Sequence, residues 1–281
     1  MNKAFAAARS YRGPVKGVIL DWSGTTADKY VIAPAVVFYE VFKKHNVPIS
    51  MPEARGPMGL RKDLHIKAIT EIPEVRKRWK DVYGREPNQK DVDNMFKDFV
   101  PMQLSCLRKY TDLIPGTTDA VNRLKNEFKC KIGSTTGFTR SMVDVLLEDA
   151  NKQGYFPDVT VAGDEVENGA RPKPHMVYKN MDLLDLTQIQ SVVKVDDTVS
   201  GVGEAVSAGC WGVGVARYSN YMGIDSLEDI GKLTADEEEK RCEHSRELLR
   251  KAGAHYVIDS IKDLPEVVED INRRLADGEK P

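Results

Sequence analysis

The sequence predicts an α/β protein: a parallel sheet with helices on both faces and an α-helical cap domain inserted after the first strand. An apolar run from Val15 to Leu20 ends at Asp21, as expected of a buried parallel strand. Residues 33–110 then show mainly helical periodicity. From residue 113 onward, short apolar runs alternate with helical segments, which is typical of repeated βα units. We therefore assign residues 1–30 and 110–281 to the core and residues 31–109 to the cap.

Composition excludes several classes of protein. The 281 residues can bury a large core, and a net charge of −2 lacks the basic excess of a nucleic-acid-binding surface. No apolar run approaches the ~20 residues that a membrane span requires. The cysteines are too far apart to predict a zinc site or a disulfide framework. We expect a cytoplasmic protein with neither nucleic acid nor membrane as a partner, whose first 14 residues are a solvated leader rather than a targeting signal.

Four helices are predicted in the cap. The first follows residue 33 and ends near residue 45. Apolar residues at every fourth position predict a second helix from Leu60 to Ile72, which Pro73 should stop. Residues 75–83 and 91–110 supply the other two, whereas residues 52–57 are expected to be irregular. Hinges that let the cap open and close are expected near residues 28–33 and 110–115.

The core elements follow from the alternating pattern. After the first strand, Gly24 allows a sharp turn. Later strands are predicted at residues 130–134, 159–162, 192–195, 211–215 and 255–258. Helices are predicted at residues 118–127, 139–152, 174–183, 200–208, 237–251 and 264–275. Because the carboxyl ends of parallel strands meet at one edge, residues that follow these strands should lie together.

Reactive side chains follow several of the predicted strands. Asp21 ends the first, hydroxyl-rich residues 133–137 follow the second, Arg171 precedes a helix, and Asp196 and Asp197 follow a later strand. Each has an ordinary structural account as a cap, a turn or a helix start. As an ordered set they supply a nucleophile, hydroxyls, a cation and carboxylates for Mg²⁺, which is the equipment of phosphoryl transfer.

These four segments resemble, in order, the motifs of the haloacid dehalogenase superfamily, and the resemblance covers nearly the whole chain. It implies a Rossmann-like core in which Asp21 is the nucleophile and binds Mg²⁺ together with Asp197 and the carbonyl of Ser23. It also implies that Thr136, or Ser134 in its place, is the phosphate hydroxyl, and that Arg171 takes the cation role.

The cap sequence narrows the resemblance. Residues 57–65, PMGLRKDLH, resemble the cap motif of the phosphonoacetaldehyde hydrolase family, and residues 21–26, 133–137 and 197–200 resemble its core motifs. This implies hydrolysis of a phosphonate aldehyde through a Schiff base on Lys62. It further implies that His65 assists proton transfer, that Met58 and Gly137 contact the substrate, and that the protein is a homodimer.

The chemistry agrees with these residue types. Breaking a C–P bond directly would leave a carbanion, whereas a protonated imine on Lys62 accepts the electrons as an enamine. Asp21 could then attack phosphorus, and water would hydrolyse the aspartyl phosphate. Lys62 must be neutral to attack the carbonyl, and burial or a nearby cation such as Arg61 would lower its pKa. His65 lies on the same helical face, three residues on.

Five positions depart from the better-known members of this family, which we expect to affect efficiency more than reaction class. Ser23 replaces alanine, Val31 cysteine, Phe138 tyrosine, Asp196 glycine and Gly201 an acid. Asp196 could take over the role of the acid that is missing at position 201.

Three other functions remain as alternatives. A capped Mg²⁺-dependent phosphatase would not need Lys62 and would lack the general acid that Ser23 replaces. A haloacid dehalogenase would have no use for Asp197. A catalytically silent binding protein would not need Asp21, Lys62, Arg171 and Asp197 together.

Overall fold

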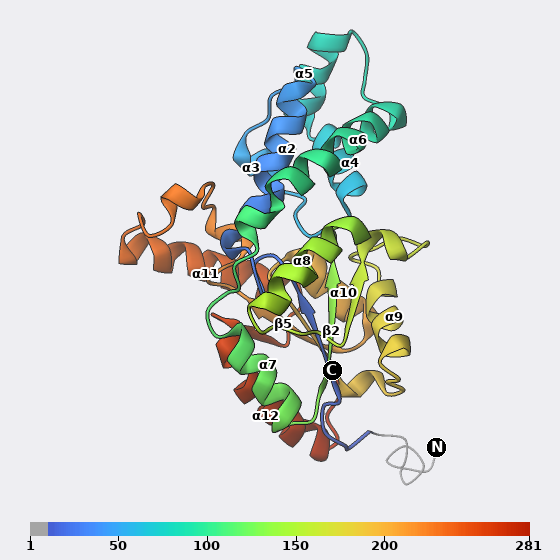
Figure 1. Cartoon of the computed structure of the whole chain (residues 1–281), viewed down its shortest axis with the longest axis vertical. Helices are drawn as coiled ribbons and strands as arrows, with labels where there is room; N and C mark the ends of the chain where they lie inside the picture. The colour runs from blue at the N-terminus through green and yellow to red at the C-terminus, as the bar shows by residue number, and fades with distance from the viewer. Residues whose placement is uncertain (1–10) are drawn as a thin grey trace.

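The structure is a computed structural model that describes residues 11–281, so the first ten residues of the predicted leader lie outside it. A sheet flanked by helices forms the lower part of the molecule, and a group of helices stands above one edge of the sheet (Figure 1). No helix in the described residues has the length and apolar character to cross a bilayer. All four cysteines are free, and three of them are buried.

The sheet is six-stranded and wholly parallel, which confirms the predicted fold class. Its spatial order is β3-β2-β1-β4-β5-β6. The strands are β1 (Gly17–Asp21), β2 (Lys131–Thr136), β3 (Val159–Ala162), β4 (Val192–Asp196), β5 (Trp211–Val215) and β6 (Tyr256–Ile258). The direction of winding reverses between β1 and β4, and a crevice at such a switch point is where open α/β sheets bind ligands.

Register brings the ends of the central strands to one level. Leu20 pairs with Ser134 of β2 and with Val195 of β4, so that Asp21 lies beside Thr135. The residue after Val195 is Asp196, and it therefore also lies at this edge. The sheet thus gathers the reactive residues that the sequence places more than 100 positions apart.

Helices cover the two faces of the sheet because its strands are apolar on both sides. Val18 and Leu20 of β1 belong to the core cluster that includes α7 (Thr117–Asn126), α8 (Arg140–Lys152) and α12 (Leu264–Ala276). Ile19 points the other way, toward α9 (His175–Leu183) and α10 (Val199–Ala208). Helix α11 (Ala235–Lys251) packs on that second face over β5. The predicted ends of these elements agree with the structure to within about two residues.

The cap consists of helices. They are α2 (Ile32–Lys44), α3 (Met51–Arg55), α4 (Lys62–Glu71), α5 (Pro73–Tyr83) and α6 (Gln89–Cys106), followed by a short 3₁₀ turn at Leu107–Tyr110. They bury an aromatic cluster of their own, in which Phe38 packs at 4.6 Å, centroid to centroid, against Phe99. The division at residues 30 and 110 stays a prediction, because no independent observation tests where the cap ends.

The prediction that residues 52–57 are irregular was wrong, since helix α3 occupies most of them. Ser50 Oγ accepts a hydrogen bond from Glu53 N at 3.3 Å, and the Glu53 carboxylate accepts one from Ser50 N at 2.7 Å. This reciprocal capping box, with Pro52 in the first turn, stabilises a helix too short to show periodicity. Its spacing, Ser-x-x-Glu, was the overlooked signal. The next predicted helix begins at Lys62 rather than Leu60.

The connection from β1 to the cap is strained. Asp28, Tyr30 and Val31 have left-handed φ angles of 49°, 69° and 56°, a region that β-branched residues such as Val31 rarely occupy. The Asp28 carboxylate stabilises this path by accepting hydrogen bonds from the amides of Ile32 and Ala33 at the start of α2. The path lies within the predicted hinge, whose movement stays a prediction.

Candidate active site

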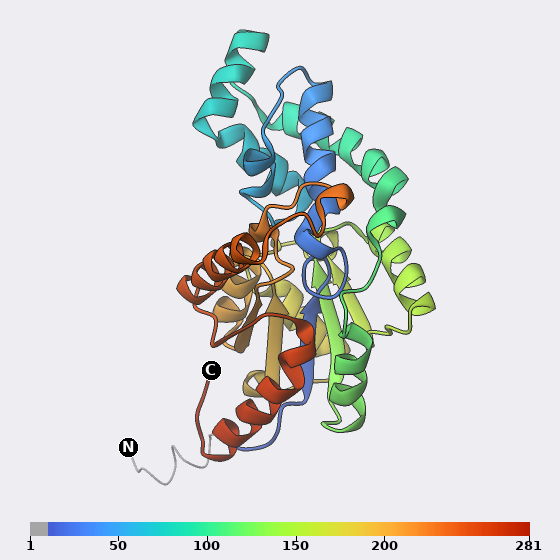
Figure 2. The same cartoon turned by 90° about the vertical axis from the view of Figure 1, so that its left-hand side faces the viewer.

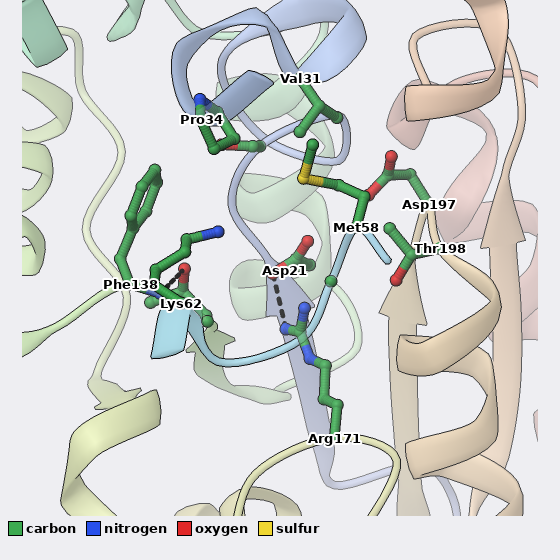
Figure 3. A pocket seen from close by; sticks show the side chains of 13 residues that line it. Asp21, Val31, Pro34, Met58, Lys62, Phe138, Arg171, Asp197 and Thr198 are labelled. Atoms are coloured by element: carbon green, nitrogen blue, oxygen red, sulfur yellow. Dashed lines mark hydrogen bonds and ion pairs between the residues drawn. The ribbon is translucent and has the colours of Figure 1, made fainter. Parts of the chain in front are cut away.

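A cavity lies between the cap and the carboxyl ends of β1, β2 and β4 (Figure 3). Val31, Pro34, Met58, Gly59 and Lys62 line it from the connection and the cap. Core residues line the remainder: Asp21, Ser23, Thr136, Gly137, Phe138, Arg171, Asp197 and Thr198. Most of the residues predicted to form the site line this cavity. The exceptions are His65 on α4, Asp196, and Ser134, which was the alternative to Thr136.

Asp21 and Arg171 form a buried ion pair at the base of the cavity. Arg171 Nη2 donates to Asp21 Oδ1 at 2.6 Å and to Thr135 Oγ1 at 2.8 Å. Burial raises the pKa of the Asp21 carboxyl, and the adjacent guanidinium acts in the opposite direction. Arg171 thereby fixes one carboxylate oxygen and leaves its own charge at the place where an anionic group would contact Asp21.

Behind this pair lies a charge network that the sequence analysis did not find. Lys194 Nζ lies 2.7 Å from Asp196 Oδ2, Arg171 Nη2 lies 3.2 Å from the same oxygen, and Arg171 Nε donates to Glu204 at 3.2 Å. Lys194 and Glu204 are fully buried. A lysine in the middle of the apolar strand β4 was the available signal, because an unpaired lysine is almost never buried.

Asp196 and Gly201 are complementary in space. The carboxylate of Asp196 accepts from Thr198 N at 3.0 Å and from Thr198 Oγ1 at 2.7 Å, besides its two cations. A Cβ atom at Gly201 would overlap this carboxylate. An acid at position 201 and one at position 196 would therefore compete for one space, which explains why the two departures from the family pattern occur together.

The carboxylates suit a hard divalent cation. Oxygens of Asp21, Asp196 and Asp197 lie within 4.8 Å of one another. The Asp196 oxygens are engaged by protein donors, whereas Asp197 Oδ1 is buried and has no hydrogen-bond partner among residues 11–281. Burial and the nearby Asp196 and Asp21 hold the pKa of Asp197 well above its usual value. A cation ligated by Asp21 and Asp197 would relieve this repulsion and satisfy the unpartnered oxygen.

Lys62 is an amine in an apolar setting. Its side chain points into the cavity toward the region of Asp21 (Figure 3), and the residue is 4% exposed. The Nζ atom lies 4.5 Å from the centroid of the Phe138 ring, and no carboxylate in the described part of the chain forms an ion pair with it. Burial lowers the pKa of Lys62 to about 8, despite the opposing charge of Asp21. A useful fraction of the amine is therefore neutral near neutral pH.

His65 lies one helical turn behind Lys62 and is fully buried. Its Nε2 is 2.8 Å from the carbonyl oxygen of Ala54, so Nε2 carries the proton and Nδ1 is left with a lone pair and no partner among the described residues. The ring stacks on Phe38 at 3.8 Å between centroids. Burial and the charge of Lys62 hold the pKa of His65 well below 6.5. The imidazole is therefore a neutral proton acceptor.

The structure distinguishes between the two candidate phosphate hydroxyls, Thr136 and Ser134. Thr136 lines the cavity, and its hydroxyl accepts from Phe138 N at 3.2 Å. Ser134, the alternative in the sequence analysis, instead accepts from Trp22 Nε1 at 3.0 Å and contacts Thr160 Oγ1 at 2.7 Å, away from the cavity. Gly137 also lines the cavity. It lies so close to the cap that a Cβ atom there would overlap the carbonyl oxygen of Leu60.

Comparison with known proteins agrees with this arrangement. No protein-family model matches the chain. A phosphonoacetaldehyde hydrolase from Syntrophobacter fumaroxidans is 40% identical over 277 residues, which cover 99% of each chain. The chain belongs to the phosphonoacetaldehyde hydrolase family. The family resemblance inferred from the cap and core motifs is thereby confirmed.

Two further relatives match this phosphonoacetaldehyde hydrolase family member over nearly its whole length. A phosphonoacetaldehyde hydrolase-like protein from the same organism is 38% identical over 279 residues, covering 99% of this chain and 100% of the relative. The crystal structure of a phosphonoacetaldehyde hydrolase-like protein from Oleispira antarctica superposes with a TM-score of 0.93 at 38% identity, over 97% of this chain and 98% of that one. The superposition spans the cap as well as the core.

Three departures from the family pattern, Ser23, Val31 and Phe138, lie in the cavity wall. Val31 and Phe138 contribute apolar side chains to this wall. Phe138 presents its ring to Lys62, whereas Val31 packs with Ala35 and Met58. In this family member the amine thus lies near one aromatic ring of the core and one of the cap: Nζ is 4.5 Å from the centroid of Phe138 and 5.8 Å from that of Phe38.

Proposed function

We propose that the chain hydrolyses the C–P bond of phosphonoacetaldehyde to acetaldehyde and phosphate. The observation that carries this proposal is the shared cavity of Lys62, a buried amine with a pKa of about 8, and Asp21, a carboxylate paired with Arg171. Relatives named phosphonoacetaldehyde hydrolase also support it. A phosphate ester would use Asp21 and Arg171 but would have no need of the amine.

The proposed reaction begins at Lys62. The neutral amine attacks the aldehyde carbon to form a carbinolamine. The carbinolamine oxygen takes one proton from the amine and one from solvent and leaves as water, which gives a protonated imine. Asp21 then attacks phosphorus, the C–P bond breaks, and its electron pair moves into the imine to form an enamine. Protonation of the enamine carbon and hydrolysis of the imine release acetaldehyde and Lys62. A second water hydrolyses the aspartyl phosphate and restores Asp21.

The surrounding residues assist these steps. Arg171 and the Thr136 hydroxyl would bind phosphonate oxygens, and Arg171, which donates to Asp21, would also hold that carboxylate in position. Met58 and Gly137 border the substrate. The free Nδ1 of His65 can accept a proton while the imine forms and return it later, because this ring is neutral and adjacent to Lys62.

The residues of the carboxylate cluster fit Mg²⁺, the cofactor that we propose. Asp21, Asp197 and the carbonyl of Ser23 would hold it, and all three residues line the cavity. When bound, the ion neutralises negative charge between the phosphonate and the Asp21 carboxylate. Ser23 stands where related phosphatases have their general acid. A carbon leaving group does not need that acid, because the imine accepts the electrons of the broken C–P bond.

Borohydride trapping tests the proposal. The protein is incubated with phosphonoacetaldehyde and Mg²⁺, reduced with borohydride and mapped by peptide mass spectrometry, while acetaldehyde and phosphate release are measured in parallel. We expect a reduced adduct on Lys62, equal amounts of both products, and loss of both in Lys62→Arg. Lys67, also on α4 but exposed, provides the matched control Lys67→Arg, which should behave as wild type.

The alternative functions predict different results. Phosphate release from p-nitrophenyl phosphate without an adduct on Lys62 would instead identify a capped phosphatase. Turnover of neither compound would favour a binding protein on this scaffold. We also propose, from the family resemblance, a homodimeric and cytoplasmic protein, and sedimentation of the purified protein tests the dimer.

A further inference from the structure

A cap arginine outside the cavity is bound mainly to the core. Arg55 ends helix α3 and is 7% exposed. Its Nη1 donates to the carbonyl of Tyr30 at 2.8 Å, its Nη2 donates to the carbonyl of Ile224, and its Nε donates to Asp225 Oδ1 at 2.8 Å. Tyr30 belongs to the strained connection, and the other two follow β5. All these contacts therefore cross from the cap to the rest of the molecule.

Asn220 connects this arginine to the carboxylate cluster. Its Oδ1 accepts from Arg55 Nη1 at 3.2 Å, and its Nδ2 donates to the backbone carbonyl of Arg55 at 3.1 Å. The backbone amide of Asn220 donates to Asp197 Oδ2 at 2.8 Å. One buried residue thus contacts the cap with its side chain and Asp197 with its main chain. The other oxygen of Asp197, Oδ1, is the unpartnered one.

Met58 and Gly59, which follow Arg55, contact the core directly. The carbonyl of Met58 accepts a hydrogen bond from Ser200 Oγ at 3.1 Å. Gly59 has a φ of 93°, and a Cβ there would overlap the hydroxyls of Thr198 and Ser200. The same short segment leads into α4 and Lys62. Arg55 and the loop that precedes Lys62 are therefore both held against the core in this closed arrangement.

The connection that leads into α2 and the segment that follows β5 are in contact, although they are far apart in the sequence. Figure 2 shows the orange segment after β5 beside the blue base of α2. Tyr30 and Ile32 share a buried cluster with Met222 and Ile224 of that segment. The guanidinium of Arg55 lies at the edge of this apolar contact and satisfies main-chain carbonyls that would otherwise be buried without partners.

We propose that Arg55 is a positioning residue that couples closure of the cap to cation binding, by acting through Asn220 on Asp197. Opening the cap would withdraw Arg55 from Tyr30, Asn220 and Ile224, and the amide that holds Asp197 Oδ2 would lose its support. Closure and cation binding then favour each other, as linkage requires. The inference rests on the proposed function, since the cation site is taken to serve that reaction.

The experiment compares variants of the full chain. Arg55→Met removes the charge and the donors, whereas Arg55→Lys keeps the charge but lacks the planar fork that reaches several acceptors. The matched control is Arg78→Met. Arg78 is also a cap arginine, but its partners, among them Glu53, belong to the cap. Small-angle X-ray scattering reports closure of the cap, and calorimetry reports the Kd for Mg²⁺. Asp197→Asn, which lacks a proposed ligand, gives the background signal of the calorimetry.

We expect Arg55→Met to show a larger radius of gyration and a Kd for Mg²⁺ raised by about tenfold, with Arg55→Lys between it and wild type. Asn220→Ala should raise the Kd in the same way, while Arg78→Met should change neither quantity. Asp225→Asn should have little effect, because the Asp225 side chain is 42% exposed.

The proposal is overturned if Arg55→Lys and Asn220→Ala remain folded by circular dichroism but keep the wild-type radius and Kd. Using these two milder variants keeps the test decisive even if Arg55→Met does not fold. Neither measurement uses phosphonoacetaldehyde. Failure of C–P hydrolysis together with intact effects on Mg²⁺ binding would reject the proposed function and leave the coupling in place.

Discussion

The cap and the core contribute opposite electrostatic environments to one cavity. The core surrounds Asp21 with Arg171, Lys194 and Asp196, which pair with one another, and with Asp197, which forms no ion pair in residues 11–281. The cap brings a single amine, Lys62, against the ring of Phe138 and gives it no ion pair. The difference indicates a division of labour, because a nucleophilic carboxylate must stay ionised whereas a nucleophilic amine must be able to lose its proton.

The sharpest way to separate the two regions is to disable the core alone. We expect Asp21→Asn to lower phosphate release by about 10⁴-fold or more, since the proposed nucleophile is lost. The cap should still react, so borohydride should continue to trap an adduct on Lys62. Absence of the adduct in this folded variant would mean that the cap chemistry depends on the core, contrary to the comparison.

The charge network of the core can be tested by moving the acid from position 196 to position 201. Asp196→Gly leaves Lys194 buried without its closest partner and should reduce the free energy of unfolding by about 3–5 kcal/mol. Gly201→Asp alone should also destabilise, because its side chain would overlap Asp196. The double variant should recover most of the loss in urea unfolding experiments. Simple additivity of the two single effects would show that position 201 cannot replace position 196.

The cap amine should control the pH dependence. The folded-state pKa of Lys62 is about 8, and the neutral form is the reactive one, so imine formation should increase with pH and level off above about 8. Below that value the rate of trapping should fall about tenfold per pH unit. His65 should add no inflection between pH 6 and 8, because its pKa lies well below 6.5. A flat profile from pH 6 to 9 would contradict the assignment.

The smallest expected effect concerns the aromatic wall. The face of the Phe138 ring favours the charged form of Lys62, so Phe138→Leu should lower the pKa of the amine by roughly half to one unit. The pH at which trapping reaches half its maximum would shift down by the same amount. Phe138→Tyr keeps a ring and serves as the control. An upward shift in Phe138→Leu would mean that the ring acts mainly by excluding water.

Much of the site could be predicted because parallel strands end at one edge. Asp21 and Asp197 follow apolar runs that are easily recognised, and register alone brings such residues together. Lys62 and His65 share a helical face through their spacing. The choice of Thr136 over Ser134 could not be made in this way, because both lie on β2 and the decision depends on contacts with Trp22 and the cap.

The sequence by itself determined the parallel sheet, the helical cap and most of the residues that line the cavity, since periodicity and strand ends are local properties. Only the tertiary structure decided which charges meet: Lys194 with Asp196, Glu204 with Arg171, and Arg55 with Asn220. Such pairs depend on how elements pack across the sheet and across the cap boundary. No local pattern specifies these distances, and burial then determines how strongly each pair acts.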